Sequence, residues 1–185
     1  RGFAYRRPPG GDRVAIITNA GGPGIITSDA VERSGLHLAS FMEETIGKLR
    51  AGLPPAANPY NPVDVLGDAR EDRYDLALGA VLQDPGVDSV VIILTPQAMT
   101  RVRETASVVA RHASNTPKTV LAVFMGGKEA EEAEEILRSG GVPNFRFPEE
   151  AVRVLVRMRE YSRSKEEAFS APLEFAVDRE KVRKI

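Results

Sequence analysis

The sequence predicts a three-layer α/β/α fold in which helices cover both faces of a parallel five-stranded sheet. Short apolar, β-branched runs recur along the chain, and the strongest of them, Val87–Leu94, is rich in Val and Ile. Such a run is expected of a strand that is covered on both faces. Helical stretches separate the runs, and each connection is long enough for the right-handed crossover that joins parallel strands.

The individual elements follow from the apolar runs and from the residues that interrupt them. The expected strands are Val14–Ile17, Leu36–Phe41, Val87–Leu94, Thr119–Phe124 and Phe145–Phe147. The expected helices cover residues 24–34, 43–53, 70–82, 101–115, 128–138 and 149–163. Breaks are indicated by Gly35, Pro54, Pro55 and Asp84-Pro85-Gly86, because Gly and Pro do not continue a helix. Residues 58–68 are expected to form a long, proline-rich turn.

The order of the elements favours a flavodoxin-like sheet with the strand order 2-1-3-4-5. In such sheets, ligands bind at the carboxyl ends of the strands, near the point where the strand order reverses. That point lies between the first and third strands. The loops Asn19–Gly24 and Thr95–Thr100 are therefore expected to lie together.

Composition limits the class of protein. The chain has 185 residues, a formal net charge of -1 and no cysteine, which predicts neither a nucleic-acid surface nor a disulfide framework. No apolar run reaches the roughly 18 residues of a membrane helix, and a cytoplasmic location is expected. One domain is expected over residues 13–163, with connecting segments at 1–12 and 164–185. The first residue is Arg1, which suggests a piece of a longer protein with a further module after residue 185.

The most informative segment joins the first strand to the first helix. It contains Asn19, Gly21, Gly22, Pro23 and Gly24. The first turn of a helix leaves about four N–H groups unpaired and carries about half a positive charge. Glycine lets an anion approach that end closely. The segment therefore predicts an anion site, with a tight turn that needs glycine only for its conformation as an equal alternative.

Groups that could perform catalysis are scarce. His37 and His112 lack an obvious carboxylate partner, so each is expected to be structural or exposed. The sequence lacks a metal-ligand cluster, a nucleophile elbow, a dinucleotide fingerprint and a P-loop. The acidic run Glu129–Glu135 is expected to be a solvated helix face. The sequence thus offers donors for an anion, but no group for proton transfer or nucleophilic attack.

Four ordered motifs resemble those of one enzyme family. They are Thr18–Gly24 (TNAGGPG), Asn61–Asp64 (NPVD) with Gly67 and Asp68, Leu94–Thr100 (LTPQAMT) and Phe124–Gly127 (FMGG). In order and spacing they resemble the second flavodoxin-like, C-terminal alpha-type domain of the ADP-forming acyl-CoA synthetases, relatives of succinyl-CoA ligase. The resemblance covers about residues 13–163, and Pro96 and Gln97 fit the acetate-type branch.

The resemblance implies a reaction shared among several domains, in which an acid, CoA and ATP give acyl-CoA, ADP and phosphate. The intermediates are an acyl phosphate and a phosphohistidine, whose histidine lies in a neighbouring domain and is matched by neither His37 nor His112. The fragment alone is expected to be inactive and to bind no cofactor or metal. CoA, ATP or ADP and Mg belong to the parent protein, whose CoA-binding, phosphohistidine and ATP-grasp domains are the expected partners.

By the same resemblance, the domain holds the phosphoryl group of the intermediate. Asn19 matches a residue that contacts the acyl substrate or phosphate, and Thr95–Ala98 matches the start of a helix whose positive end faces the phosphohistidine. The implied contacts are Asn19, Gly21, Gly22, Gly24, Thr95, Gln97, Ala98 and Met99. Candidate supporting residues are Asn61, Asp64, Gly126 and Gly127. Asn61 and Asp64 are nevertheless more typical of a turn held by its own side chains.

The sequence leaves two functions open. The domain belongs either to an active synthetase or to a catalytically dead, synthetase-like region that regulates a protein acetyltransferase. A phosphohistidine loop in the neighbouring domain would distinguish the two. A response-regulator receiver is a weaker alternative, because its acidic pocket is missing after the first strand.

Overall fold

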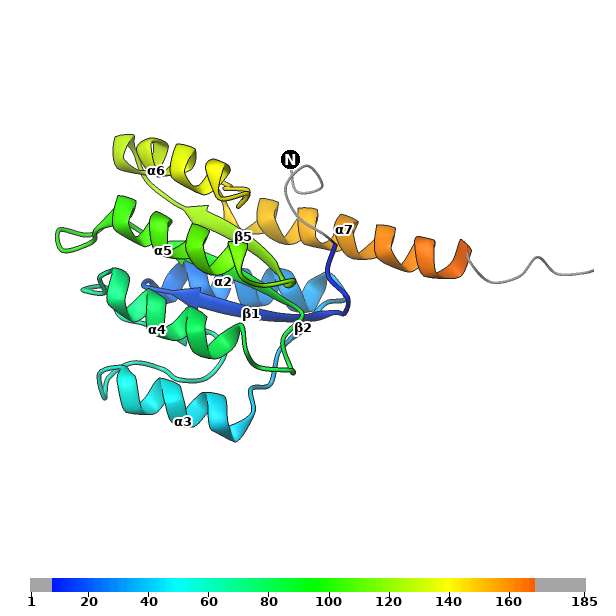
Figure 1. Cartoon of the computed structure of the whole chain (residues 1–185), viewed down its shortest axis with the longest axis horizontal. Coiled ribbons are helices and arrows are strands. Elements are labelled where there is room, and N and C mark those ends of the chain that lie inside the picture. Colours follow the sequence, from blue (N-terminus) through cyan, green and yellow to red (C-terminus); the bar gives the residue numbers. More distant parts are fainter. Residues whose placement is uncertain (1–7, 169–185) are drawn as a thin grey trace, which may run out of the picture.

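The apolar runs assemble into a parallel sheet between two layers of helices (Figure 1). The computed structural model describes residues 8–168. The strands are β1 Arg13–Thr18, β2 His37–Leu38, β3 Val63–Asp64, β4 Ser89–Leu94 and β5 Thr119–Phe124. Their order is β2-β1-β4-β5, β3 also pairs with β1, and every pair is parallel. The predicted α/β fold class is confirmed, and this strand order is compatible with a flavodoxin-like topology.

Helices bury both faces of the sheet. They are α2 Gly21–Arg33, α3 Glu43–Gly52, α4 Glu71–Val81, α5 Val102–Ser114, α6 Lys128–Ser139 and α7 Pro148–Ala168. Helices α2 and α7 cover one face, and α3 to α6 cover the other (Figure 1). Ala15 and Ile17 of β1 enter the core under α3 to α6, whereas Val14 and Ile16 enter the opposite core. Because both cores are apolar, β1 is a continuous apolar run.

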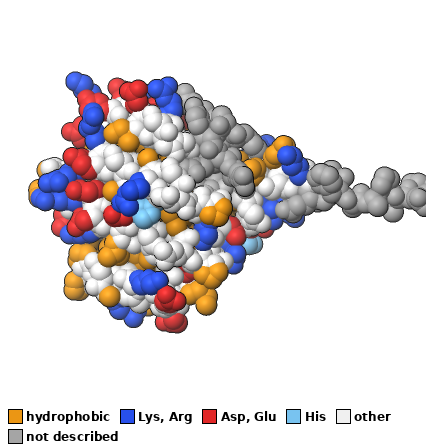
Figure 2. All heavy atoms as spheres, in the orientation of Figure 1, with side chains coloured by type: hydrophobic (Ala, Val, Ile, Leu, Met, Phe, Trp, Pro, Cys, Tyr) orange, Lys and Arg blue, Asp and Glu red, His pale blue; other side chains and the backbone are white. Residues whose placement is uncertain are grey.

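The outer surface is polar and of mixed charge. Acidic and basic side chains lie side by side over the part of the molecule formed by α5 and α6 (Figure 2). Arg103 of α5 forms an ion pair with Glu132 of α6 at 3.2 Å. The acidic residues between 129 and 135 are exposed, which confirms the predicted solvated face. None of the helices in residues 8–168 has the length and apolar character needed to cross a membrane.

Two of the predicted strands differ in the structure. The second strand is limited to His37–Leu38, and the fifth, expected at residues 145–147, does not form. A single bridge joins Asn144 to Ala122 instead, and the Asn144 Oδ1 atom accepts a hydrogen bond from the Phe124 N–H at 2.9 Å. Helix α7 begins at Pro148, so the chain leaves the sheet edge directly after that bridge. Helix α7 then continues beyond residue 163, and the rest of the two expected connecting segments, residues 1–7 and 169–185, lies outside the described residues.

One edge of β1 is shared by two very short strands. β2 pairs with the beginning of β1 and β3 with its end, which leaves the middle of this edge without a neighbouring strand. The Asn61 carboxamide fills the gap. Its Oδ1 accepts from the Ile16 N–H at 2.9 Å, and its Nδ2 donates to Val14 O at 2.8 Å and Ala39 O at 3.0 Å. Asn61 therefore satisfies buried backbone groups that would otherwise need a strand.

Ion pairs hold the amino-terminal end of β1. The Arg13 guanidinium contacts both oxygens of Asp88 at 2.9 Å, and the Arg13 backbone N–H donates to the same carboxylate at 3.0 Å. These hydrogen bonds lower the pKa of the Asp88 carboxyl, against the opposing effect of its partial burial. Next to Arg13, Asp12 contacts Arg159 of α7 at 2.7 Å. The beginning of β1 is thereby joined to β4 and to α7.

Replacement of the strand-mimicking carboxamide should destabilise the whole domain. Asn61→Ala leaves the buried Ile16 N–H without its partner and removes the carboxamide hydrogen bonds to Val14 O and Ala39 O, so we expect the free energy of unfolding to fall by about 3 kcal/mol. Asn115→Ala is the matched control, because it removes a single exposed hydrogen bond to Arg111 O and should lower the free energy by less than about 1 kcal/mol. Urea denaturation measures both variants. Equal losses would show that Asn61 does not replace a strand.

The Arg13–Asp88 pair should make stability depend on acid pH. Because the folded chain lowers the pKa of Asp88, the stabilisation is fully present above the unfolded value of about 3.9 and is lost as the pH falls through the folded value. Asp88→Asn should therefore be less stable than the parent above about pH 5, and the difference should shrink below about pH 4. Thermal unfolding across pH 3 to 7 measures this, with Asp29→Asn in an exposed pair as the control. A pH-independent difference between the parent and Asp88→Asn would contradict the expectation.

Candidate functional site

The loops that follow the strands gather at the carboxyl edge of the sheet. They are residues 19–20 after β1, 65–70 after β3, 95–101 after β4 and 125–127 after β5. Because the strands are parallel, helices α2, α4, α5 and α6 all begin at this edge. The positive ends of their dipoles point to this edge, and of these four helices only α2 has no acidic residue in its first turn to offset its dipole.

The ends of β1 and β4 are locked together by one side chain. The Asn19 Nδ2 donates to Thr95 O at 2.9 Å, and the Asn19 Oδ1 accepts from the Thr95 N–H at 2.9 Å. We call this reciprocal pair the Asn19–Thr95 clasp. Asn19 is only 3% exposed. The predicted proximity of the loops after the first strand and after residue 94 is thereby confirmed.

The glycine-rich segment forms the first turn of α2 rather than a hinge before it. The helix begins at Gly21, with Ala20 as its N-cap, without a side-chain cap and without an acidic residue in the first turn. Gly21 and Gly22 are exposed, and a Cβ atom added to either would meet nothing within 4 Å. Within residues 8–168, the N–H groups of Gly21 and Gly22 donate no hydrogen bond. Packing inside the described part of the chain therefore does not explain these two glycines.

Gly24 has a different role in the same turn. It is buried, and a Cβ added there would lie 3.0 Å from the Thr18 Cγ2. Its N–H donates to Ala20 O at 3.2 Å, within the helix start. Glycine at this position lets α2 pack closely on the end of β1, so Gly24 belongs to the fold more than to a binding surface.

The predicted helix 101–115 is confirmed as α5, which begins at Val102, so the expectation that Thr95–Ala98 starts a helix is wrong. The Thr100 N–H donates to Gln97 O at 3.0 Å, and the Gln97 N–H donates to the Thr100 Oγ1 at 2.9 Å. This closed turn delays the helix until Val102. The backbone N–H of Gln97 is thus already paired. In the described chain, the N–H groups of the exposed residues Ala98 and Met99 make no hydrogen bond.

The NPVD motif serves the fold. Asn61 completes the edge of β1, and the Asp64 Oδ1 accepts from the Leu66 N–H at 2.9 Å. Leu66 has a φ of 73°, a backbone conformation that a non-glycine residue adopts only when it is well supported. Asp64 provides that support. The side chains of Asn61 and Asp64 are therefore both engaged in holding backbone.

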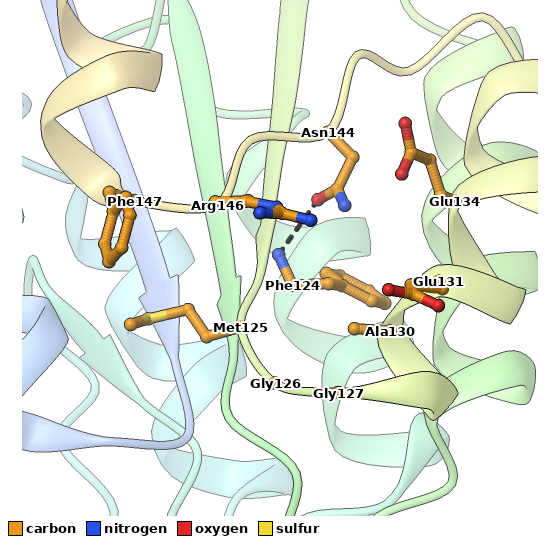
Figure 3. Close-up of a pocket in the computed structure, with 10 residues that line it drawn as sticks. All are labelled: Phe124, Met125, Gly126, Gly127, Ala130, Glu131, Glu134, Asn144, Arg146 and Phe147. Atoms are coloured by element: carbon orange, nitrogen blue, oxygen red, sulfur yellow. Dashed lines mark hydrogen bonds between the residues drawn. The ribbon is translucent and has the colours of Figure 1, made fainter.

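The Gly126–Gly127 turn lies between two hollows at the same edge. Gly126 has a φ of 127°, and a Cβ there would lie 2.9 Å from the Pro96 Cγ, so the loops after β4 and β5 are in close contact. A hollow of about 500 Å³ on one side includes Thr95 and Pro96. A second, of about 400 Å³, is lined by Arg146, Phe147 and two glutamates of α6 (Figure 3). The edge is therefore hollowed beside both loops.

Two side-chain contacts of α4 have no signal in the sequence. Tyr74 of α4 is fully buried, and its hydroxyl donates to Ile93 O near the end of β4 at 2.9 Å. His112 does have a carboxylate partner, contrary to the expectation, because its Nε2 lies 2.5 Å from the Asp75 Oδ1. Asp75 lies on α4, 37 residues earlier, so only the packing of α4 against α5 brings the two together.

Comparisons with known proteins show the family of the chain. The model of the Ligase-CoA domain family matches residues 14–168. The chain is 43% identical over 174 residues to the ADP-forming acetate–CoA ligase I of Archaeoglobus fulgidus, a match that covers 93% of this chain and 24% of that protein. It is 41% identical over 152 residues to the alpha subunit of the ADP-forming acetate–CoA ligase II of Pyrococcus furiosus, covering 80% of this chain and 33% of the subunit.

A solved structure supports the same assignment. The dinucleotide-forming acetyl-coenzyme A synthetase 1 of Ca. Korarchaeum cryptofilum superposes with a TM-score of 0.83 and 25% sequence identity, over 92% of this chain and 38% of that one. The chain spans 24% to 33% of the length of the two curated relatives described above. On the family match over residues 14–168 and the identity to both ligases, the chain belongs to the Ligase-CoA domain family.

Proposed function

We propose that this domain forms one wall of the active site of an ADP-forming acyl-CoA ligase, which uses ATP to join an acid to CoA and releases ADP and phosphate. In this proposal it is the second flavodoxin-like, C-terminal alpha-type domain. It holds the acyl phosphate and the phosphohistidine that form on a neighbouring domain. The observation that carries the proposal is the exposed start of α2, where Gly21 and Gly22 leave room for an anion.

The electrostatics of this edge suit a phosphoryl group. The first turn of α2 has no acidic residue, and no side chain caps it, so its own helix does not neutralise its positive end. The turn at Ala98 and Met99 adds two exposed backbone N–H groups on the neighbouring loop. Fixed donors of this kind stabilise developing charge strongly once a partner domain excludes water.

Asn19 and Thr95 act behind the contact surface in this proposal. Both polar atoms of the Asn19 carboxamide are bonded to the Thr95 backbone, and the residue is 3% exposed. The clasp therefore fixes the distance between the two donor loops. Such preorganisation matters because small displacements of positioning groups lower reaction rates steeply.

The reacting groups come from elsewhere in the parent protein. Of the two histidines among the described residues, His37 lies beside the amino-terminal end of β1, away from the carboxyl edge. The Nε2 atom of His112 is paired with the Asp75 carboxylate. We propose that the CoA-binding, phosphohistidine and ATP-grasp domains supply the histidine, the nucleotide, Mg and CoA. The isolated domain should consequently show no ligase activity.

The glycines of α2 provide a sharp test in the full-length parent protein. Gly21→Ala and Gly22→Ala meet no atom of this domain, so we expect unchanged stability or a gain of up to about 1 kcal/mol. Phosphoenzyme formation from acyl-CoA and phosphate should nevertheless fall at least about tenfold, because the added methyl group keeps the phosphoryl oxygens from the N–H groups. The rate of phosphoenzyme formation and the melting temperature are the two measurements.

Gly47→Ala is the matched control for these variants. Gly47 is exposed within α3, and a Cβ there also meets nothing within 4 Å, but it lies outside the carboxyl edge. Its phosphoenzyme formation should equal that of the parent. Full activity of both α2 variants would refute the proposed role of this turn. If the unsubstituted full-length protein forms no phosphoenzyme at all, the proposed ligase activity is contradicted and the regulatory alternative is favoured.

A further inference from the structure

A tyrosine hydroxyl is buried beneath the carboxyl edge of the sheet. Tyr74 has 0% exposure and is among the largest fully buried side chains of the domain. Its hydroxyl donates to Ile93 O at 2.9 Å, and the backbone N–H of Asn19 donates to the same hydroxyl oxygen. Phenylalanine would fill the same core volume without a polar group to desolvate, so the ring alone does not explain the hydroxyl.

The two partners of this hydroxyl lie on the two strands that carry the proposed site. Thr18 and Ile93 form the last paired position of the β1–β4 ladder, and Asn19 follows directly. One residue further along, the Asn19–Thr95 clasp joins the two chains again through side-chain atoms. Tyr74 thus contacts the backbone of the residue whose side chain forms the clasp.

The state of the hydroxyl is also fixed by its surroundings. Burial raises the pKa of the Tyr74 phenol well above its ordinary value, and the nearby charge of Asp64 raises it further. The phenol therefore stays neutral and remains a donor to Ile93 O. A neutral, fully enclosed hydroxyl with a donor and an acceptor bond has little freedom to move.

We propose that Tyr74 is a positioning residue, which holds Asn19 and the end of β4 so that the start of α2 and the loop 95–100 stay at the separation that the bound phosphoryl group requires. This inference rests on the proposed function of the α2 start. Tyr74 itself lies beneath the surface and touches no substrate. Its effect is transmitted only through Asn19 and Ile93 to the donor loops.

The test compares Tyr74→Phe with Leu78→Val in the full-length parent protein. Leu78 is likewise 0% exposed on α4, so its substitution lowers stability without removing a polar group. The measurements are the rate of phosphoenzyme formation from acyl-CoA and inorganic phosphate, the KM for phosphate, and the melting temperature. We expect Tyr74→Phe to lower the rate at saturating phosphate about tenfold. Leu78→Val should stay within about twofold of the parent at an equal or larger loss of melting temperature.

Asn19→Ala, measured alongside, separates a failure of this inference from a failure of the proposed function. If Asn19→Ala is impaired but Tyr74→Phe matches Leu78→Val, the hydroxyl is only structural and the inference is overturned. If Asn19→Ala keeps the rate of the parent, the proposed role of the site is wrong and the positioning role falls with it. Impairment of Asn19→Ala and Tyr74→Phe, with Leu78→Val unaffected, supports the inference.

Discussion

The backbone of β1 must be hydrogen-bonded along both edges, because the strand is buried between two apolar cores. One edge is complete through β4, whereas the other has only two strand fragments and is completed by the Asn61 carboxamide. The same device recurs where other strands stop. Asn19 extends the contact between β1 and β4, and Asn144 pairs with the Phe124 N–H in place of a fifth strand. Helix α2 directly follows the end of β1, so its position depends on how Asn61 and Asn19 hold that strand.

The parts of the fold that sequence predicts well are those specified by local composition. The cores of β1, β4 and β5 are β-branched apolar runs, and their limits agree with the prediction within two residues. Side chains that replace a strand leave no periodic signal, because their partners are distant. The expectation of a turn held by its own side chains is confirmed for Asp64, which accepts a hydrogen bond from the Leu66 N–H. Asn61 instead donates to Val14 O and Ala39 O, which are 47 and 22 residues away in the sequence.

In the candidate site, too, the sequence predicts which loops lie together but not the detailed conformation of each loop. The proximity of the two loops follows from the order of parallel strands, and it is confirmed by the Asn19–Thr95 clasp. The expected helix start at residues 95–98 is wrong, because the Thr100 hydroxyl and backbone close a turn on Gln97. Sequence alone cannot place that closure, since it depends on the backbone conformation after Pro96. Helix α5 therefore begins only at Val102, and the residues before it form a loop at the carboxyl edge.

The glycines at the carboxyl edge of the sheet are of two kinds: those that packing inside the domain requires, and those that it does not. Gly24 and Gly126 are required by close neighbours, the Thr18 methyl group and the Pro96 ring. Gly21 and Gly22 have no such neighbour, yet glycine is a poor helix former and its backbone loses more entropy on folding than that of any other residue. In the proposed function, these two glycines leave room for a group from outside the domain to approach the N–H groups at the start of α2. The phosphoryl group proposed to bind there carries the negative charge that the positive end of α2 favours.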